Sequence, residues 1–252
     1  MSDKIALITG GNRGLGRSTA LHLARKGIHI VLTYRSNEAE AQEVQAEILK
    51  LGASAAILRL DTADTASFPD FAERLRDVLV RHWGRKSIDF LVNNAGIGIH
   101  KPFMETTEDE FDALMNVHVK GVFFLTQTLL PMIRDGGRIV TLSSGLARFS
   151  LPGYAAYASM KGAVEVLTRY LAKELGPRGI AVNAIAPGAI ETDFGGGVVR
   201  DNAEVNRYIA ATTAMGRAGQ PDDIGGAMAA LLTGEIQWMT GQRIEVSGGQ
   251  NL

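Results

Sequence analysis

The stretch YAAYASMKG, residues 154–162, places two tyrosines and one lysine at spacings that could support proton transfer. Residues four apart on a helix share a face, so Tyr157 and Lys161 are neighbours, whereas Tyr154 is displaced from Tyr157 by about one turn. A phenol with a pKa of about 10 exchanges protons poorly at neutral pH, but a nearby ammonium favours the phenolate. Tyr157 is therefore the better candidate for an acid or base that acts on a carbonyl oxygen.

Small polar residues follow two apolar runs that read as strands. Ser143 and Ser144 end the run GRIVTLSS, and residues 93–96, NNAG, follow the run IDFLV. The carboxyl ends of parallel strands meet at one edge of a sheet, where nucleotides bind in open α/β folds. We expect both groups at that edge, where small residues let a nucleotide approach the backbone.

A glycine-rich turn, TGGNRGLG at residues 9–16, follows the first apolar run and precedes a helical pattern. Gly10, Gly14 and Gly16 stand at G-x3-G-x-G spacing, which permits a tight turn and close backbone approach. The following helix offers free N–H groups and the positive end of its dipole to a pyrophosphate. The pattern favours a dinucleotide site over a turn that merely packs strand on helix.

The end of the second predicted strand indicates which dinucleotide binds. Folds that bind NAD usually carry Asp or Glu there, but this chain has Tyr34 followed by Arg35. With Arg13 in the glycine turn, two guanidinium groups are available to pair with a 2′-phosphate. The residues favour NADP(H) over NAD(H), the alternative being that both arginines are solvated surface residues.

Short apolar runs alternate with segments of helical periodicity along the chain. Such alternation predicts a Rossmann-type, doubly wound α/β domain over residues 1–252, with a seven-stranded, mostly parallel sheet covered by helices on both faces. A glycine-rich segment at about 190–215 is predicted to form a substrate lid. The seven predicted strands are residues 4–9, 28–33, 53–60, 88–92, 137–142, 179–185 and 242–246.

Composition narrows the function classes. The 252 residues carry a formal net charge of −1 and no cysteine, which excludes disulfides and thiolate chemistry. The balanced charge favours neither nucleic acid nor an anionic membrane as partner. No run approaches the roughly 20 apolar residues of a membrane span. The N-terminus, MSDKIALITGG, has no basic region followed by a long apolar stretch, so we expect a cytoplasmic protein. The histidines lack metal-ligand spacing, so we expect no metal site.

Seven motifs occur in one order along nearly the whole chain, and Ser144 stands thirteen residues before Tyr157. With these motifs the chain resembles the short-chain dehydrogenase/reductase family, in its branch of about 250 residues, and is similar to 3-oxoacyl-ACP reductase-like ketoreductases. The motifs are TGGNRGLG, LDTAD, NNAG, YASMK, APGAIETDF, GRAGQPDDIG and GQRIEVSGG.

The resemblance implies roles for individual residues. Tyr157 would be the general acid, Lys161 would hold the nicotinamide ribose and lower the pKa of Tyr157, and Ser144 would bind the substrate oxygen. Tyr154 and Phe194 would line the substrate pocket. The residues expected at the cofactor are Gly10, Asn12, Arg13, Gly14, Leu15, Gly16, Tyr34, Arg35, Ser36, Asp61, Thr62, Asn93, Ala95, Gly96, Tyr157, Lys161, Pro187, Gly188, Ile190 and Thr192.

One position departs from the family pattern. The family usually has a catalytic asparagine five residues before the phenylalanine that stands at Phe123, and this chain has His118 there. Asn116 lies two residues away, a rotation of about 200° on a helix, and is not equivalent. His118 either maintains a helix bend through its backbone or joins a proton relay with its own titration near neutrality.

The implied activity is hydride transfer between NADP(H) and a carbonyl or secondary alcohol carbon, on a small, largely uncharged substrate. In the related enoyl-reductase branch the working tyrosine stands seven residues before the lysine, where this chain has Tyr154. The competing hypotheses are an enoyl-type reductase that uses Tyr154, a dinucleotide-sensing protein without turnover, and a dehydratase or epimerase. The resemblance also implies a homotetramer packed through residues 108–131 and 154–175.

Overall fold

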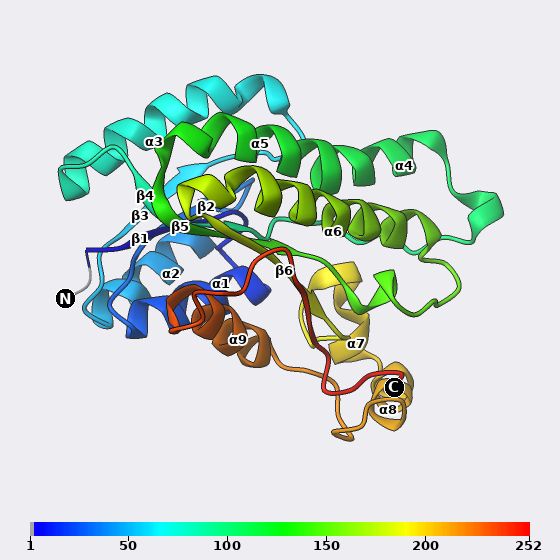
Figure 1. Ribbon diagram of the computed structural model, residues 1–252. Coiled ribbons are helices and arrows are strands. Elements are labelled where there is room, and N and C mark those ends of the chain that lie inside the picture. The colour runs from blue at the N-terminus through cyan, green and yellow to red at the C-terminus, as the bar shows by residue number, and fades with distance from the viewer. Residues whose placement is uncertain (1–2) are drawn as a thin grey trace.

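The computed structural model describes residues 3–252 and has at its centre a seven-stranded sheet (Figure 1). The strand order is β3-β2-β1-β4-β5-β6-β7, and every pair of neighbours is parallel. The predicted doubly wound α/β class is confirmed, and each of the seven predicted strands is present. The strands are β1 Ile5–Ile8, β2 His29–Tyr34, β3 Ala55–Arg59, β4 Ile88–Asn93, β5 Ile133–Leu142, β6 Ala181–Pro187 and β7 Arg243–Val246.

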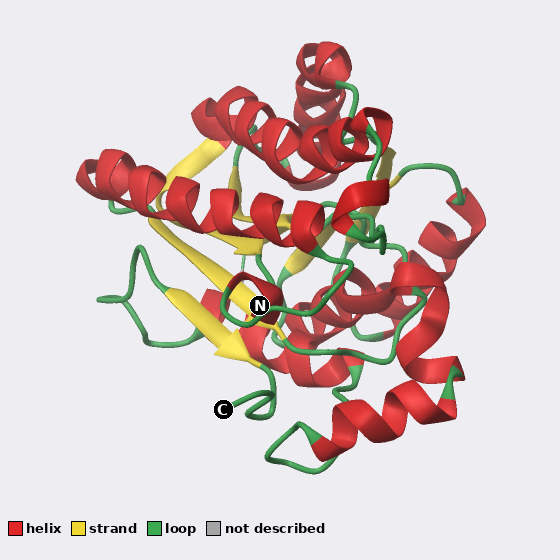
Figure 2. Ribbon diagram, turned by 90° about the vertical axis from the view of Figure 1, so that its right-hand side faces the viewer, coloured by secondary structure: helices red, strands yellow, loops and turns green. Residues whose placement is uncertain are grey.

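Helices cover both faces of the sheet, as right-handed crossovers between parallel strands require. Helices α3, α5 and α6 lie over one face, and α1, α2 and α9 lie over the other (Figures 1 and 2). The helices are α1 Gly14–Arg25, α2 Glu38–Lys50, α3 Phe68–Trp83, α4 Glu108–Met115, α5 Gly121–Leu129, α6 Ala155–Leu175, α7 Val198–Asp201, α8 Ala203–Ala211 and α9 Pro221–Thr233.

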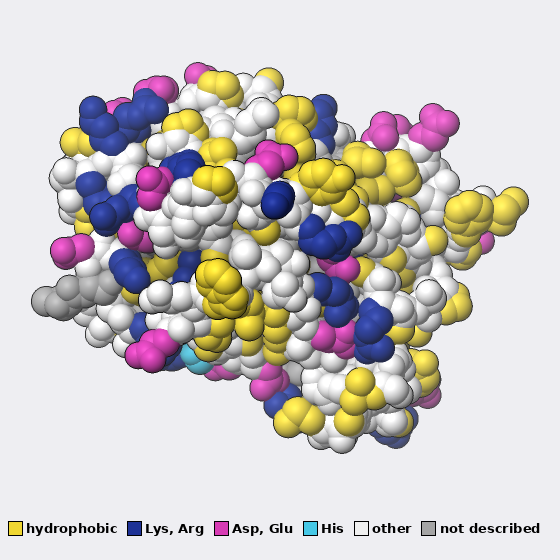
Figure 3. Space-filling view, viewed as in Figure 1, with side chains coloured by type: hydrophobic (Ala, Val, Ile, Leu, Met, Phe, Trp, Pro, Cys, Tyr) yellow, Lys and Arg dark blue, Asp and Glu magenta, His cyan; other side chains and the backbone are white. Residues whose placement is uncertain are grey.

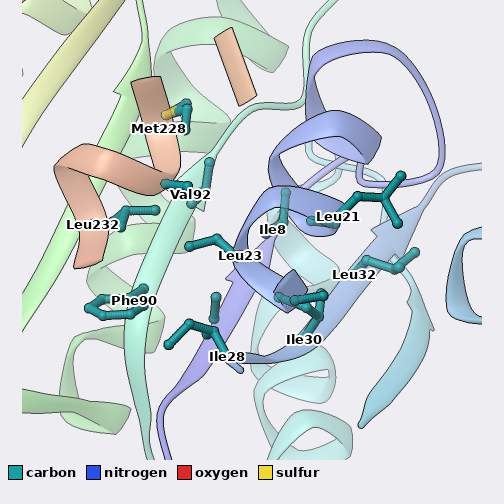
Figure 4. Packing of buried hydrophobic residues seen from close by; sticks show 14 of the residues in the cluster. Ile8, Leu21, Leu23, Ile28, Ile30, Leu32, Phe90, Val92, Met228 and Leu232 are labelled. Atoms are coloured by element: carbon teal, nitrogen blue, oxygen red, sulfur yellow. The ribbon is translucent and has the colours of Figure 1, made fainter. Parts of the chain in front are cut away.

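The sheet separates two large hydrophobic cores because successive strand residues point to opposite faces. Ile8 and Ile30 pack with α1 and α9 in one core (Figure 4), whereas Leu7 and Val31 pack in the other. Helices α1 and α9 approach closely at Gly225, where a β-carbon would lie 2.2 Å from the Ser18 hydroxyl. This packing holds α1, and thus its N-terminus, against the sheet.

The order of the strands reverses between β1 and β4, which are neighbours in the sheet but not in the sequence. In open α/β sheets, ligands bind in the crevice beyond the carboxyl ends of the strands at such a switch point. The glycine-rich turn follows β1 and residues 93–96 end or follow β4. The topology therefore brings these two predicted segments together.

Three local features differ from the expected elements. Strand β5 begins at Ile133 rather than 137, beside an irregularity in the register between Ile88 and Phe90. A π-helical turn, Asn116–Lys120, joins α4 to α5. The predicted lid contains α7 and α8, preceded by three consecutive glycines, 195–197, whose φ angles are all positive.

The surface in Figure 3 carries basic and acidic side chains interspersed, without a large area of one sign. Exposed apolar side chains occur at a tip before α4, where Phe103 and Met104 are 78% and 90% exposed. Within residues 3–252, no helix combines the length and apolar character of a bilayer span, and no cluster of three potential metal ligands occurs.

Candidate active site

A cavity of about 700 Å³ runs along the carboxyl edge of the strands, from Arg35 after β2 to Tyr208 on α8. Most predicted site residues line it. The ones that do are Gly10, Asn12, Arg13, Gly14, Leu15, Arg35, Ser36, Asp61, Thr62, Ala95, Gly96, His118, Ser144, Tyr154, Tyr157, Lys161, Pro187, Gly188, Ile190, Thr192 and Phe194.

Three predicted cofactor residues, Gly16, Tyr34 and Asn93, do not line the cavity. Gly16 lies behind the turn, where a β-carbon would approach the Gly10 carbonyl oxygen to 2.3 Å. Tyr34, the last residue of β2, is buried in the hydrophobic core, and Asn93 donates its amide to the Thr126 hydroxyl at 3.1 Å. These three residues shape the site from behind the residues that line the cavity.

The glycine turn after β1 is bonded to the segment after β4. The Asn94 side chain donates to the backbone oxygens of Thr9 and Gly10, at 2.8 and 3.1 Å. The Thr9 hydroxyl in turn accepts the backbone N–H groups of Asn94 and Ala95. This bonding holds the first turn of α1 at the cavity, so that its orphan N–H groups face any ligand there.

The N-terminus of α1 fits a pyrophosphate. Arg13 precedes the helix without a side-chain cap, and no acidic residue stands in the first turn. Gly14, with a φ of 54°, has only Thr192 side-chain atoms near the place of a β-carbon, at 3.8 and 3.9 Å. The backbone N–H donors and the positive end of the α1 dipole thus face open space where a ligand can bind.

Two arginines stand at the β2 end of the cavity. Arg13 and Arg35 are exposed, and neither guanidinium forms a hydrogen bond or ion pair with another of residues 3–252. Glu40 also lines this part of the cavity, but its carboxylate accepts the Asn12 amide at 2.6 Å. Unpaired guanidinium groups at this place suit a phosphate group on the adenosine ribose.

Tyr157 lies at the other end of the cavity, in the first turns of α6, and is 8% exposed. The His118 ring contacts it edge-on, with centroids 5.3 Å apart, and the Phe194 ring lies 5.8 Å away. Burial raises the pKa of Tyr157 above its usual value, and a hydrogen bond with Ser144 opposes that rise. The phenol is therefore protonated at neutral pH.

Ser144 begins a turn after β5, with its hydroxyl accepting the Leu146 N–H at 3.2 Å. The Ser144 and Tyr157 hydroxyl groups come from different elements, both residues line the cavity, and Ser144 is near enough to lower the pKa of the phenol. A carbonyl oxygen that enters between them can accept a hydrogen bond from each.

Lys161 is one helical turn beyond Tyr157 and 5% exposed. Its ammonium donates to the Leu142 carbonyl oxygen at 2.7 Å and lies 5.5 Å from the centre of the Tyr157 ring. Burial lowers the pKa of Lys161 to about 7. The expected lowering of the Tyr157 pKa by this ammonium is not found in the protein alone, because burial dominates both groups.

His118 lies in the π-helical turn and is 1% exposed. Its Nε2 is 2.7 Å from the Ile97 carbonyl oxygen, to which it donates, and its Nδ1 has no partner among the described residues. Burial, reinforced by Lys161, lowers the pKa of His118 to about 3. A pKa this low favours the structural role of His118 over the proton relay, and the helix is irregular at this position.

A charged network supports Ser143 and Ser144 from behind, and no sequence pattern predicted it. Glu165 accepts the Ser143 hydroxyl at 2.5 Å and the Arg243 guanidinium at 2.7 Å. Arg243 also donates to the Ser144 carbonyl oxygen at 3.2 Å. No local pattern indicates these partners, because β7 and α6 are far apart in the sequence.

Apolar and aromatic side chains surround the space beyond Tyr157 and Ser144. Tyr154 and Phe194, the predicted substrate-pocket residues, both line it, and Tyr154 stacks at a tilt on His100 with centroids 4.8 Å apart. The other walls come from the segment after β4, the loop after β5 and the predicted lid. The additional walls are Ile97, Leu146, Phe149, Leu151, Pro152, Val198, Val199, Val205, Tyr208 and Ile209.

The parallel sheet has a glycine turn at its switch point, and a Ser–Tyr–Lys group lies at the opposite end of the same cavity. This combination defines a dinucleotide-binding oxidoreductase fold. The family model described as enoyl-(acyl carrier protein) reductase matches residues 10–251. The chain belongs to the short-chain dehydrogenase/reductase family.

Relatives of this chain include several ketoreductases. The hydroxynaphthalene reductase-like protein Arp2 of Metarhizium brunneum is 38% identical, over 99% of this chain and 95% of that protein. LugOII, a promiscuous reductase that catalyses keto-reduction at C1 during lugdunomycin biosynthesis, superposes with a TM-score of 0.94 at 37% identity, covering 99% and 98% of the two chains. The angucycline C-6 ketoreductase LanV, solved with bound NADP, superposes with a TM-score of 0.93 at 33% identity. The match covers 98% of this chain and 95% of LanV.

Proposed function

We propose that this protein is an NADP(H)-dependent ketoreductase in which Tyr157 is the general acid. The observation that carries the proposal is the meeting of the buried, protonated Tyr157 with the Ser144 hydroxyl at the wall of the cavity. Lys161 lies one turn away on the same helix. Ketone reduction needs a proton donor at the carbonyl oxygen, and a protonated phenol supplies it.

The cofactor would lie along the cavity between the two ends. Gly14 and Leu15 would bind the pyrophosphate through the first turn of α1, and Arg13 and Arg35 would pair with a 2′-phosphate. At the opposite end, Lys161 would hold the ribose of the nicotinamide. When bound, the nicotinamide supplies the hydride, and the protein supplies placement.

The chain's own groups would perform the proton chemistry. Ser144 would donate a hydrogen bond to the carbonyl oxygen, which orients the carbonyl and stabilises the charge that develops on its oxygen. Tyr157 would donate its proton to that oxygen, and the product is a secondary alcohol. His118, neutral at physiological pH, would hold the Ile97 backbone and the Tyr157 ring in place without exchanging a proton.

The residues that line the cavity favour a flat, largely uncharged ketone as the substrate. Aromatic side chains of Phe149, Tyr154, Phe194 and Tyr208 line the space beyond Tyr157. Such rings favour stacking on a planar substrate. The activities for which the relatives are named, keto-reduction of angucycline-type compounds and hydroxynaphthalene reduction, support the same class. Helices α7 and α8 would close over it and exclude water.

The test is NADPH and NADH oxidation by purified protein against cyclic aromatic ketones, simple ketones and 2-enoyl thioesters. We expect ketone reduction with NADPH preferred. The description of the matching family model makes enoyl reduction the second candidate, in which Tyr154 would act. Enoyl thioesters reduced faster than every ketone would support that candidate, and tight NADPH binding without any turnover would support the sensing protein.

The homotetramer stays a prediction. Apolar side chains on the helices expected at the interface are partly exposed, including Phe123 on α5 and Tyr170 on α6, at 42% and 66%. Burial of such side chains between subunits is favourable. Light scattering of the purified protein tests it, and a monomer would contradict it.

A further inference from the structure

The C-terminal residues form part of the cavity wall, and one of them is polar and buried. Gln250 lines the cavity and is 2% exposed. Its backbone is held from two sides: the Arg148 guanidinium donates to its carbonyl oxygen at 2.8 Å, and its N–H donates to the Ser247 hydroxyl at 3.3 Å. An isolated bridge to Thr213 fixes it against the end of the lid. This residue is therefore rigidly placed.

The amide of Gln250 has a defined orientation. Its Oε1 accepts the backbone N–H of Ala189 at 2.9 Å, and an N–H donor requires the oxygen of the amide at that position. The Nε2 group, with two donors, forms no hydrogen bond with any other of residues 3–252, and Gln250 lines the cavity. This donor is free to form a hydrogen bond with a ligand oxygen in the cavity, which adds to the affinity for that ligand.

Apolar residues line the same cavity as this donor. Phe149 and Ile209 line the same part of the cavity, and Pro187 and Gly188 precede the Ala189 N–H that binds the amide. At Gly188 a β-carbon would lie 2.9 Å from the Gln250 Oε1. The absence of a side chain at Gly188 therefore lets the Gln250 amide pack against the segment after β6, which the resemblance assigns to the nicotinamide end of the cofactor.

We infer that Gln250 is a specificity-determining residue that donates a hydrogen bond from Nε2 to a second oxygen of the ketone substrate. This inference rests on the proposed function. Ser144 and Tyr157 bind the oxygen that is reduced, and Gln250 binds another carbonyl or hydroxyl oxygen of the same molecule. The substrate class is thereby narrowed from flat ketones to diketones and hydroxyketones. A site built to bond a substrate oxygen discriminates strongly against the analogue that lacks it.

The experiment compares kcat/KM for 1-tetralone with those for a set of tetralones that carry one added hydroxyl or keto oxygen at successive ring positions. The variants are Gln250→Glu, which keeps an oxygen for the Ala189 N–H but replaces the Nε2 donor, and Gln250→Met, which removes both. Gln242→Glu, an exposed position outside the cavity, is the matched control for the added charge.

We expect the unmodified enzyme to prefer at least one oxygenated tetralone by about 10-fold or more, consistent with one buried hydrogen bond. Gln250→Glu and Gln250→Met should reduce that ratio to near one, and Gln242→Glu should preserve it. Turnover of 1-tetralone with no preference for any oxygenated analogue would overturn the inference while leaving the proposed function intact. A preference that survives in Gln250→Glu would also overturn it. Absence of turnover on every ketone would contradict the proposed function itself, and the inference with it.

Discussion

The two ends of the cavity are built by different means. At the nucleotide end, the binding groups are backbone N–H groups of α1 and two exposed guanidinium groups, Arg13 and Arg35. At the reaction end, the groups are buried side chains: His118, Tyr157 and Lys161 are 1%, 8% and 5% exposed. Burial shifts the pKa of all three groups at the reaction end. The nucleotide end is organised to pair with charged groups of a ligand, and the reaction end is organised to set the protonation states of its side chains.

Removal of the buried ammonium should have the largest effect at the reaction end. Lys161→Met should lower kcat/KM for ketone reduction by roughly 100-fold or more, the lower range for loss of a group that supports acid–base catalysis. Lys173→Met, an exposed lysine on the same helix, is the control. Equal activity of the two variants would show that the buried ammonium has no part in the reaction.

The Lys161→Met variant also tests the pKa of Lys161, through the pH dependence of the free energy of unfolding. Because burial lowers that pKa to about 7, the unfolded chain binds more protons than the folded protein between pH 7 and about 10. The free energy of unfolding of the unmodified protein should therefore rise with pH across that window. Lys161→Met should lack this part of the rise, measured by urea unfolding at pH 6.5 and 9.5. Parallel pH dependence of the two proteins would contradict the low pKa.

Loss of a guanidinium at the nucleotide end should weaken NADPH binding, because it removes a positive charge that would pair with the 2′-phosphate. Arg35→Ala and Arg13→Ala should each weaken NADPH binding by about 10- to 100-fold, the value of one charge-assisted hydrogen bond, and should affect NADH little. Arg17→Ala, on α1 but paired with Glu47, is the matched control. Titration of fluorescence with both cofactors gives the dissociation constants. Equal weakening for NADPH and NADH would contradict pairing with a 2′-phosphate.

Backbone geometry at the nucleotide end can be tested with glycine substitutions. Gly16→Ala should lower the free energy of unfolding by roughly 1–3 kcal/mol, because its β-carbon would lie 2.3 Å from the Gly10 carbonyl oxygen. Gly162→Ala, in the interior of α6 with open space around it, should instead raise that free energy by about 0.5–1 kcal/mol. Denaturant unfolding measures both, and a neutral Gly16→Ala would show that the turn adapts.

The smallest effect is expected for the titration of His118. With a pKa of about 3, this imidazole stays neutral from pH 5 to 8, so it adds no break to the pH profile of kcat. His118→Asn should leave the shape of that profile unchanged over this range, even where the rate itself changes. A break near pH 6.5 that disappears in His118→Asn would contradict the assignment.

The sequence was most informative where function depends on the backbone and on local spacing. The glycine turn, the strands and the Tyr157–Lys161 pair were all predicted, because each is set by neighbours within a few residues. Contacts between distant segments could not be read in this way: Gln250 reaches Ala189, and Glu165 reaches Arg243. Protonation states also escaped prediction, since the neutral His118 follows from burial beneath the loop after β4.

The central claim is that Tyr157, and not Tyr154, protonates the carbonyl oxygen. The most direct measurement is the single-turnover rate of NADPH oxidation with a saturating cyclic ketone, compared among the unmodified protein, Tyr157→Phe and Tyr154→Phe. We predict a loss of about 10²- to 10⁴-fold for Tyr157→Phe and less than about 10-fold for Tyr154→Phe. Retained ketone reduction by Tyr157→Phe, or the larger loss in Tyr154→Phe, would contradict the account.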